Sequence, residues 1–166
     1  MKHLLVVYSS DCAKNGHVDP DFTSLVYGDS NGNGKIILNN LQAGSYVFFH
    51  TNIGGEKYIT AYFYVEKILD KVNNKFEIEG LKSDAKSDDV IIMGSRVHSK
   101  ILTIPLKLDR ALLLELESFN LDESYFNEKI NNGYSELEAI SHKTFNFKLL
   151  SEKDKENLFE KCLNRG

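Results

Sequence analysis

The run YITAYFYVEKI, from Tyr58 to Ile68, constrains the fold of this chain more than any other stretch. It is rich in aromatic and β-branched residues, and its side chains alternate between two faces, as they do in a strand. One face would carry Tyr58, Thr60, Tyr62, Tyr64 and Glu66, and the other Ile59, Ala61, Phe63 and Val65. We therefore expect one long strand and a sheet built around it.

Shorter apolar or β-branched runs, separated by turn signals, predict further strands. Pro105 lacks an amide hydrogen and so confines the last of these strands to a sheet edge. Asn-Gly occurs twice within Asp29–Lys35, which predicts a tight turn or hairpin. The runs are His3–Tyr8, Tyr46–Thr51, Phe76–Ile78, Val90–Met93 and Ile101–Leu108.

From about Leu108 the apolar period becomes helical. Asp109 is a predicted N-cap, and Ser135 with Glu138 forms a predicted capping box. The expected helices are 109–119, 122–131, 135–142 and 151–164. The sequence thus predicts an α+β protein in one domain, 1–166. Residues 1–108 would form a strand-rich part with the site, and 109–166 a helical C-terminal third.

Charge and cysteine content exclude several classes of protein. A net charge of −4 argues against a protein that coats nucleic acid non-specifically. Cys12 and Cys162 match no zinc or redox spacing, which indicates free thiols in a reducing cytoplasm, with one terminal disulfide as the alternative. The apolar run LLVVY is too short for a signal peptide, and no segment is long enough to span a membrane. We expect a cytoplasmic protein with no membrane partner.

The loop Gly16–Asp29, GHVDPDFTSLVYGD, is the first candidate site because it gathers polar side chains on a segment without a clear helix or strand pattern. His17, Asp19 and Asp21 are spaced by two, so in an extended backbone they would point the same way, and they are candidate catalytic acid–base groups. Asx turns around Pro20 are the alternative. Neither zinc-type spacing nor a calcium loop is present, which argues against a metal site here.

Tyr27, Gly28 and Asp29 are candidate ligand-binding residues at the end of the same loop. Gly28 would let the backbone approach a ligand closely, and Asp29 could accept a hydrogen bond from a ribose hydroxyl or a base amine. A tight turn explains the three residues equally well.

The segment Gly94–Lys100, GSRVHSK, is the best candidate for anion binding. Backbone amides, hydroxyls and a guanidinium are groups that proteins use for phosphate, although the P-loop spacing is absent. A solvated connection between strands is an equal alternative. The candidate ligand contacts are Ser95, Arg96, His98, Ser99 and Lys100.

Two other features allow a structural and a functional interpretation. His50, at the end of a strand, is a candidate ligand contact but is more simply a buried structural histidine. The tyrosine face of Tyr58–Tyr64 is more often core than a platform for stacking bases.

Three strings together resemble the third of the nucleotide-modification-associated domain families, found in phage and mobile-element contexts. They are GHVDPDFTSLVYGDS, the run Leu38–Phe49 and YITAYFYVEKI, and the resemblance covers about residues 3–110. Ser45 stands where the family has Asp, and Thr60-Ala61 where it tends to have Ile-Gly. The matching positions are His17, Asp19, Pro20, Asp21, Phe22, Tyr27, Gly28, Asp29, Gly44, Phe48, Phe49, Gly94, Ser95, Arg96 and Ser99.

The pattern LQAGSYVFFHT followed by YITAYFYV is also similar, more weakly, to PUA-like domains. Those domains form a small open barrel and hold bases, often modified ones, in a pocket. The resemblance implies a curved or barrel-like mixed β-sheet for this chain.

Together these features suggest a protein that binds a nucleotide or modified nucleobase and is associated with DNA or nucleotide modification. The ligand would lie between the 16–29 and 94–100 loops, with Arg96 and its neighbours facing phosphate and Asp29 with Tyr27 facing sugar or base. A nucleic acid partner would contact a local part of the surface, because the protein is not expected to coat DNA non-specifically. One alternative is an enzyme that transforms a nucleotide or base with His17 and Asp19 or Asp21, with or without a divalent metal ion. Another is a non-catalytic protein-interaction module.

Overall fold

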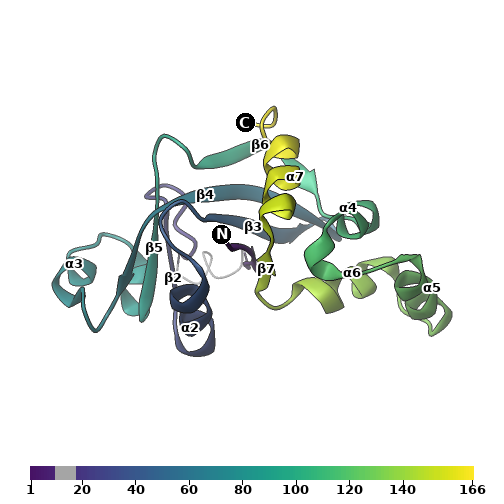
Figure 1. Cartoon of the computed structure of the whole chain (residues 1–166), viewed down its shortest axis with the longest axis horizontal. Helices are drawn as coiled ribbons and strands as arrows, with labels where there is room; N and C mark the ends of the chain where they lie inside the picture. The colour runs from purple at the N-terminus through teal and green to yellow at the C-terminus, as the bar shows by residue number, and fades with distance from the viewer. Residues whose placement is uncertain (10–17) are drawn as a thin grey trace.

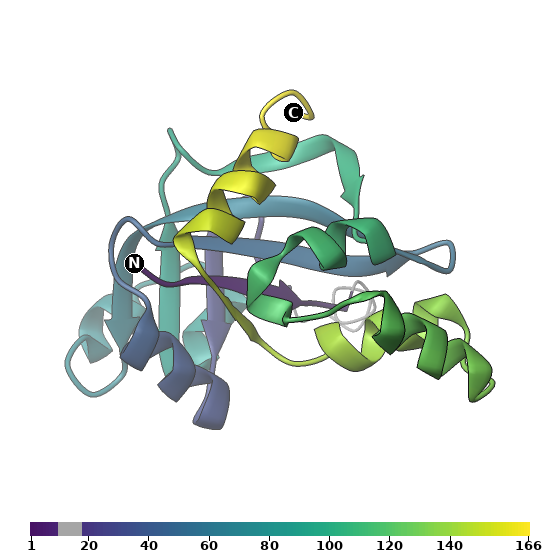
Figure 2. The ribbon, with the colours of Figure 1, turned by 45° about the vertical axis from the view of Figure 1, so that its right-hand side comes forward.

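A computed structural model describes residues 1–9 and 18–166 of the chain. Its strands form a mixed sheet in the order β2-β5-β4-β3-β1-β7, and β6 pairs with β4 away from this path. Figures 1 and 2 show that the sheet curves, with β2 and β5 standing steeply to β1 and β3. The strands are β1 (His3–Val7), β2 (Val26–Asp29), β3 (Tyr46–Ile53), β4 (Glu56–Asp70), β5 (Val90–Gly94), β6 (Lys100–Lys107) and β7 (Lys148–Leu150).

The helices of the C-terminal third gather on one side of this sheet, and α7 crosses over its strands (Figure 2). The predicted α+β class, with a curved mixed sheet and a helical last third, is therefore confirmed. The helices are α2 (Asn31–Asn40), α3 (Lys75–Glu79), α4 (Arg110–Glu115), α5 (Glu123–Asn131), α6 (Glu136–Thr144) and α7 (Glu152–Cys162), with 3-10 turns η1 (Asp84–Ser87) and η2 (Glu117–Phe119).

The predicted long strand is β4, which pairs with β3 along one edge and with β6 and then β5 along the other. Its strict alternation is interrupted at Thr60, because Phe49 pairs with Ala61 whereas the next residue of β3 pairs with Ile59. An extra residue of this kind is a β-bulge, and it reverses which face the following side chains take. Ile59 consequently packs with Tyr62, on the face opposite to that of Ala61 and Phe63.

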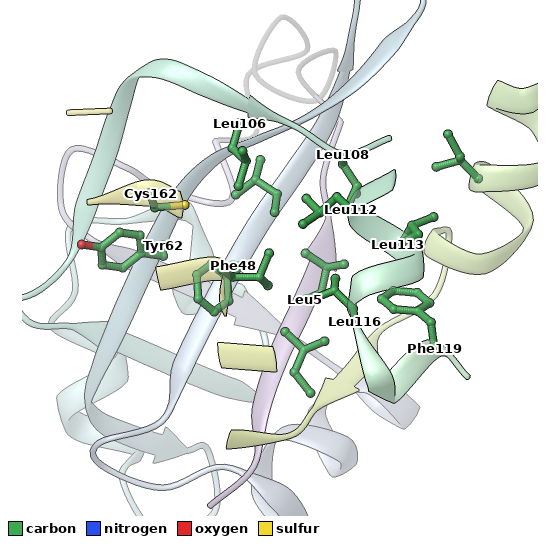
Figure 3. Packing of buried hydrophobic residues seen from close by; sticks show 14 of the residues in the cluster. Leu5, Phe48, Tyr62, Leu106, Leu108, Leu112, Leu113, Leu116, Phe119 and Cys162 are labelled. Carbon is green, nitrogen blue, oxygen red and sulfur yellow. The ribbon is translucent and has the colours of Figure 1, made fainter. Parts of the chain in front are cut away.

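Two large apolar clusters lie on the two faces of the sheet. On one face, leucines of α4 and Phe119 of η2 pack on Leu5 and Phe48 (Figure 3). On the other face, Ile37 of α2 packs against residues of β1, β3 and β4. Leu4 and Val6 belong to the second cluster and Leu5 to the first, so β1 is buried on both faces as the sequence predicts.

The helix starts are set by local capping, as predicted. Asp109 accepts a hydrogen bond from the Leu112 amide (3.0 Å), and Ser135 with Glu138 forms the capping box. The predicted helix 109–119 is shorter than expected, because α4 ends at Glu115 and the chain continues as η2.

Three local predictions were wrong, and one strand was not predicted. Residues 29–35 form the end of β2 and the start of α2 rather than a hairpin, because the burial of Ile37 and the close packing of Gly34 on Val90 outweigh the turn preference of Asn-Gly. Residues 76–78 lie in α3, not in an edge strand, and Ile78 is the one of its side chains that is buried. Val26–Asp29, expected to be irregular, is β2, and β7 was not predicted.

Among residues 1–9 and 18–166, no helix has the length and apolar character needed to cross a membrane.

Candidate functional site

A cavity of about 310 Å³ lies between the end of β1 and the turn that precedes β2. We call it the Asp19 cavity. Small-molecule sites commonly start at about this size. Its lining residues are Tyr8, Ser9, Val18, Asp19, Pro20, Phe22 and Thr23.

One wall of the Asp19 cavity is aromatic. The rings of Tyr8 and Phe22 meet edge to face with centroids 5.3 Å apart. Phe22 in turn contacts Phe49 (5.6 Å) and Phe63 (6.0 Å), which belong to the sheet. The Tyr8 hydroxyl forms a hydrogen bond of 2.9 Å with Oγ1 of Thr60, at the bulge of β4. These contacts hold the aromatic wall against the sheet.

Asp21 shapes the turn beneath this wall. Its Oδ1 accepts hydrogen bonds from the amides of Thr23 (3.1 Å) and Ser24 (3.0 Å), and its backbone pairs with Val26. Burial alone would raise the pKa of Asp21, but the hydrogen bonds from Ser24 and its neighbours outweigh burial and lower it. The side chain therefore works as the Asx turn that the sequence allows as an alternative.

Asp19 is in a different environment. The Gly28 amide donates to both of its carboxyl oxygens, at 3.2 Å and 3.3 Å. Burial, together with the smaller effects of the nearby Asp88 and Asp29 charges, raises the pKa of Asp19 to about 8, against the lowering effect of this hydrogen bond. At neutral pH the Asp19 cavity consequently contains a carboxyl group that is largely protonated.

Only glycine fits at position 28, because its neighbours leave no room for a side chain. A methyl group there would lie 2.7 Å from Oδ2 of Asp88 and 2.9 Å from the carbonyl oxygen of Ala85. The sequence predicts that a ligand approaches the backbone at Gly28, but the close neighbours there are η1 and the residues that follow it. This packing brings Asp88 towards Asp19.

Gly28→Ala is expected to lower the free energy of unfolding by about 2 kcal/mol, because the added methyl group overpacks the contact with η1. Urea denaturation measures the change. Gly32→Ala is the matched control, because Gly32 lies in α2 with nothing within 4 Å of the added group, so it should be neutral or slightly stabilising. Equal stabilities of the Gly28→Ala variant and the wild type would contradict this account.

Tyr27 and Asp29 bond to each other and to their surroundings. The buried Tyr27 hydroxyl donates to Oδ2 of Asp29 (2.7 Å), and Asn33 donates to the same oxygen. Burial and then the Asp29 charge raise the pKa of Tyr27 well above its ordinary value. Asp29 pairs with Val90, at the opposite end of β5 from Gly94.

The 94–100 segment therefore begins at the far end of β5 from Asp29. Its first residue does meet the 16–29 loop, because the Gly94 amide donates to the Leu25 carbonyl oxygen (2.7 Å). The rest of the segment turns elsewhere. The His98 ring lies on Tyr64 (5.1 Å), and Lys100 donates to the carbonyl oxygen of Leu163 (3.0 Å).

The two hydroxyls of this segment lie close to β4. Ser99 accepts a hydrogen bond from the Tyr64 amide (3.0 Å), and Ser95 is buried. Arg96 is exposed. The structure thus joins the two predicted loops at Leu25 and Gly94, but it separates Asp29 from Arg96, His98 and Lys100.

His50 does not line the Asp19 cavity, although its carbonyl oxygen accepts a hydrogen bond from the Tyr8 amide (2.9 Å). Its Nε2 is 3.1 Å from the Thr144 carbonyl oxygen, and no described group bonds to its Nδ1. Burial, with the nearby Lys57 charge, lowers the pKa of His50 to about 3, so the ring is neutral. It links β3 to α6, which is the structural interpretation of this residue.

Two residues named from the sequence, Cys12 and His17, lie outside the described residues. Within the described ranges, no group of three or more His, Cys, Asp or Glu side chains could hold a metal ion. Cys162 is buried in the helical layer, and burial raises the pKa of its thiol to about 11.

Sequence reasoning did not identify Tyr8, Ser9 or Thr23 as lining residues, and it named Phe22 only through the family resemblance. In the sequence, Tyr8 looks like the last residue of a buried strand. In the folded chain it follows the end of β1 and lines the cavity. An aromatic residue directly after Asp-Pro-Asp, in a loop, was the available signal.

A scan against protein-family models finds no match for this chain. A search of curated proteins likewise finds no similar sequence. Among solved structures, the chain is similar to the crystal structure of human THYN1 protein in complex with 5-methylcytosine-containing DNA. The similarity covers 100% of both chains, with 11% sequence identity and a TM-score of 0.46. Similarity at this level assigns the chain neither a family nor a ligand.

Proposed function

We propose that this protein binds a nucleobase, free or as part of a nucleoside or nucleotide, in the Asp19 cavity. One observation carries the proposal: an aromatic wall and the Asp19 carboxyl group, whose pKa burial raises to about 8, line the same cavity. Aromatic side chains stack on bases of every kind, and polar groups in the same pocket then hydrogen-bond to the base edge. Tyr8 and Phe22 would supply the apolar surface and Asp19 the hydrogen bonds.

Volume and charge restrict the part of the ligand that enters. About 310 Å³ accommodates one heterocycle with part of its sugar rather than a dinucleotide. Asp21, Asp29 and Asp88 all act on Asp19 as like charges, so a phosphate group at this depth would be repelled. The base end of the ligand would therefore enter the cavity, with any phosphate pointing out towards solvent.

Nucleosides are the probes that test this function. We expect calorimetric titration with adenosine, cytidine, 5-methylcytidine, uridine and guanosine to show saturable binding of at least one of them. Phe22→Leu should weaken that binding by about tenfold, because it keeps an apolar side chain but removes the ring face on which a base stacks. Phe76→Leu is the matched control, because Phe76 is 89% exposed on α3, away from the cavity.

Absence of binding for every nucleoside, or equal binding by the Phe22→Leu variant, would reject the proposal. Comparing a nucleoside with its 5′-monophosphate also tests the phosphate contact that the sequence predicts for Arg96. If that contact forms, the monophosphate binds more tightly, and Arg96→Ala removes the difference.

The raised pKa of Asp19 also favours a second candidate, an enzyme that transforms the bound base. A carboxyl group that titrates near neutral pH in a cavity suits general acid–base catalysis. Incubation of each bound nucleoside with the protein, followed by mass spectrometry, would detect a product. If catalysis occurs, Asp19→Asn should abolish turnover, because an amide cannot transfer a proton in this way.

A further inference from the structure

The Asp19 carboxyl group is surrounded by acidic groups. Asp21 of the turn, Asp29 at the end of β2, and Asp88 after η1 all act on it as negative charges. Tyr27 of β2 is close enough for its own pKa to respond to Asp19. Among the described residues, no Lys, Arg or His forms an ion pair with Asp19. Asp21, Asp29 and Asp88 would each repel a negative charge on this side chain.

Hydrogen bonding to Asp19 is also sparse. Within residues 1–9 and 18–166, a single N–H, from Gly28, is shared between the two carboxyl oxygens. An ionised carboxylate has about four acceptor positions, whereas a protonated carboxyl group has one O–H donor and fewer acceptor positions to fill. With one shared donor and several like charges, the protonated form suits this environment better.

We propose, on the basis of the nucleobase-binding function above, that Asp19 reads the base as a neutral carboxylic acid in the Asp19 cavity. Its O–H donates to a ring nitrogen or carbonyl oxygen of the base, and its carbonyl oxygen accepts the adjacent N–H. The ligand class is an uncharged heterocycle whose edge presents one acceptor beside one donor. Adenine, cytosine and uracil have such an edge. Guanine also has one, at O6 and N1–H, and in addition a two-donor edge, N1–H beside N2–H, that suits an ionised carboxylate.

A carboxamide offers the same donor and acceptor as a neutral carboxyl group, and this gives a direct test. Asp19→Asn should bind the best nucleoside within about threefold of the wild-type affinity at pH 6.5. Asp19→Ala should bind it about tenfold more weakly or worse, the loss typical of a two-bond contact between a side chain and a base.

The pH profile separates this role from a purely structural one. Wild-type affinity should be constant from pH 6 to 7 and fall about tenfold by pH 9, because the acid form that binds is lost above a pKa of about 8. Affinity of the Asp19→Asn variant should not follow that decline. The melting temperature of each variant confirms that it is folded at the pH of measurement.

Four outcomes decide the matter. The pattern above supports a neutral Asp19. Two results would overturn the inference while the proposed function stands. In the first, Phe22→Leu weakens nucleoside binding but Asp19→Ala leaves it unchanged. In the second, the Asp19→Asn variant binds as weakly as the Asp19→Ala variant, and the affinity of the wild type does not change with pH. No wild-type binding of any nucleoside overturns the inference and the proposed function together.

Discussion

Asp19→Asn is expected to raise the free energy of unfolding by about 3 kcal/mol at pH 8.5 and by progressively less towards pH 4. The carboxyl group of Asp19 titrates near 8 in the folded chain, against an ordinary value of 3.8. Ionisation therefore favours the unfolded chain as the pH rises from about 4 to 8, at no more than about 1.4 kcal/mol per pH unit, and the partial exposure of Asp19 to solvent reduces the total to about 3 kcal/mol. Below pH 4 both states are protonated, and this contribution disappears. Asparagine removes the ionisation altogether.

Urea denaturation at pH 4, 6 and 8.5 measures this difference in stability. Asp89→Asn, at an exposed position just before β5, removes the same charge elsewhere and controls for the change in net charge. A stability difference that is the same at all three pH values would refute the account of Asp19. A side chain that lowers stability where it stands is more often retained for function than for folding, which is why we place it at the centre of the site.

Asp154→Ala is expected to destabilise the protein by about 3 kcal/mol. Asp154, in the first turn of α7, is 1% exposed, and its two carboxyl oxygens accept the amides of Glu117 (2.8 Å) and Ser118 (2.9 Å) of η2. Alanine would leave both N–H groups buried without an acceptor, at about 1–3 kcal/mol for each unsatisfied group. The helical layer would lose the bond that fixes α7 to η2.

Thermal and urea unfolding measure the effect. Asp154→Asn retains one of the two acceptors and should fall between the wild type and the alanine variant. Glu156→Ala, on an exposed position of the same helix, should change stability by less than about 0.5 kcal/mol. A loss of under 1 kcal/mol for Asp154→Ala would show that water or a local shift satisfies the two amides.

Features of the fold that depend on neighbouring residues could be predicted from the sequence. The burial of β1, the length of β4 and the helix starts at Asp109, Ser135 and Ser151 all follow from patterns within a few residues. The start of α2 could not be predicted in this way. Its Asn-Gly pairs favour a turn, and the contacts that make it a helix come from β5, far away in the chain.

The candidate site, too, could be predicted from the sequence only in part. The loop that contains Asp19 and Gly28 could be singled out from its composition, because polar and glycine residues concentrate there. The proximity of Asp88 to Asp19 depends on the packing of η1 against β2, which no local pattern reveals. The separation of Asp29 from Arg96 depends on the register of β2 against β5.

The position of β4 has a consequence for how the molecule can come apart. Its residues belong to all three apolar clusters, with Ile59 and Tyr62 in the helical layer, Phe63 in the layer beneath the aromatic wall, and Leu69 beside α3. Unfolding of this one strand would remove packing contacts from all three clusters at once. We therefore expect the helical third and the sheet to unfold together, in a single cooperative transition.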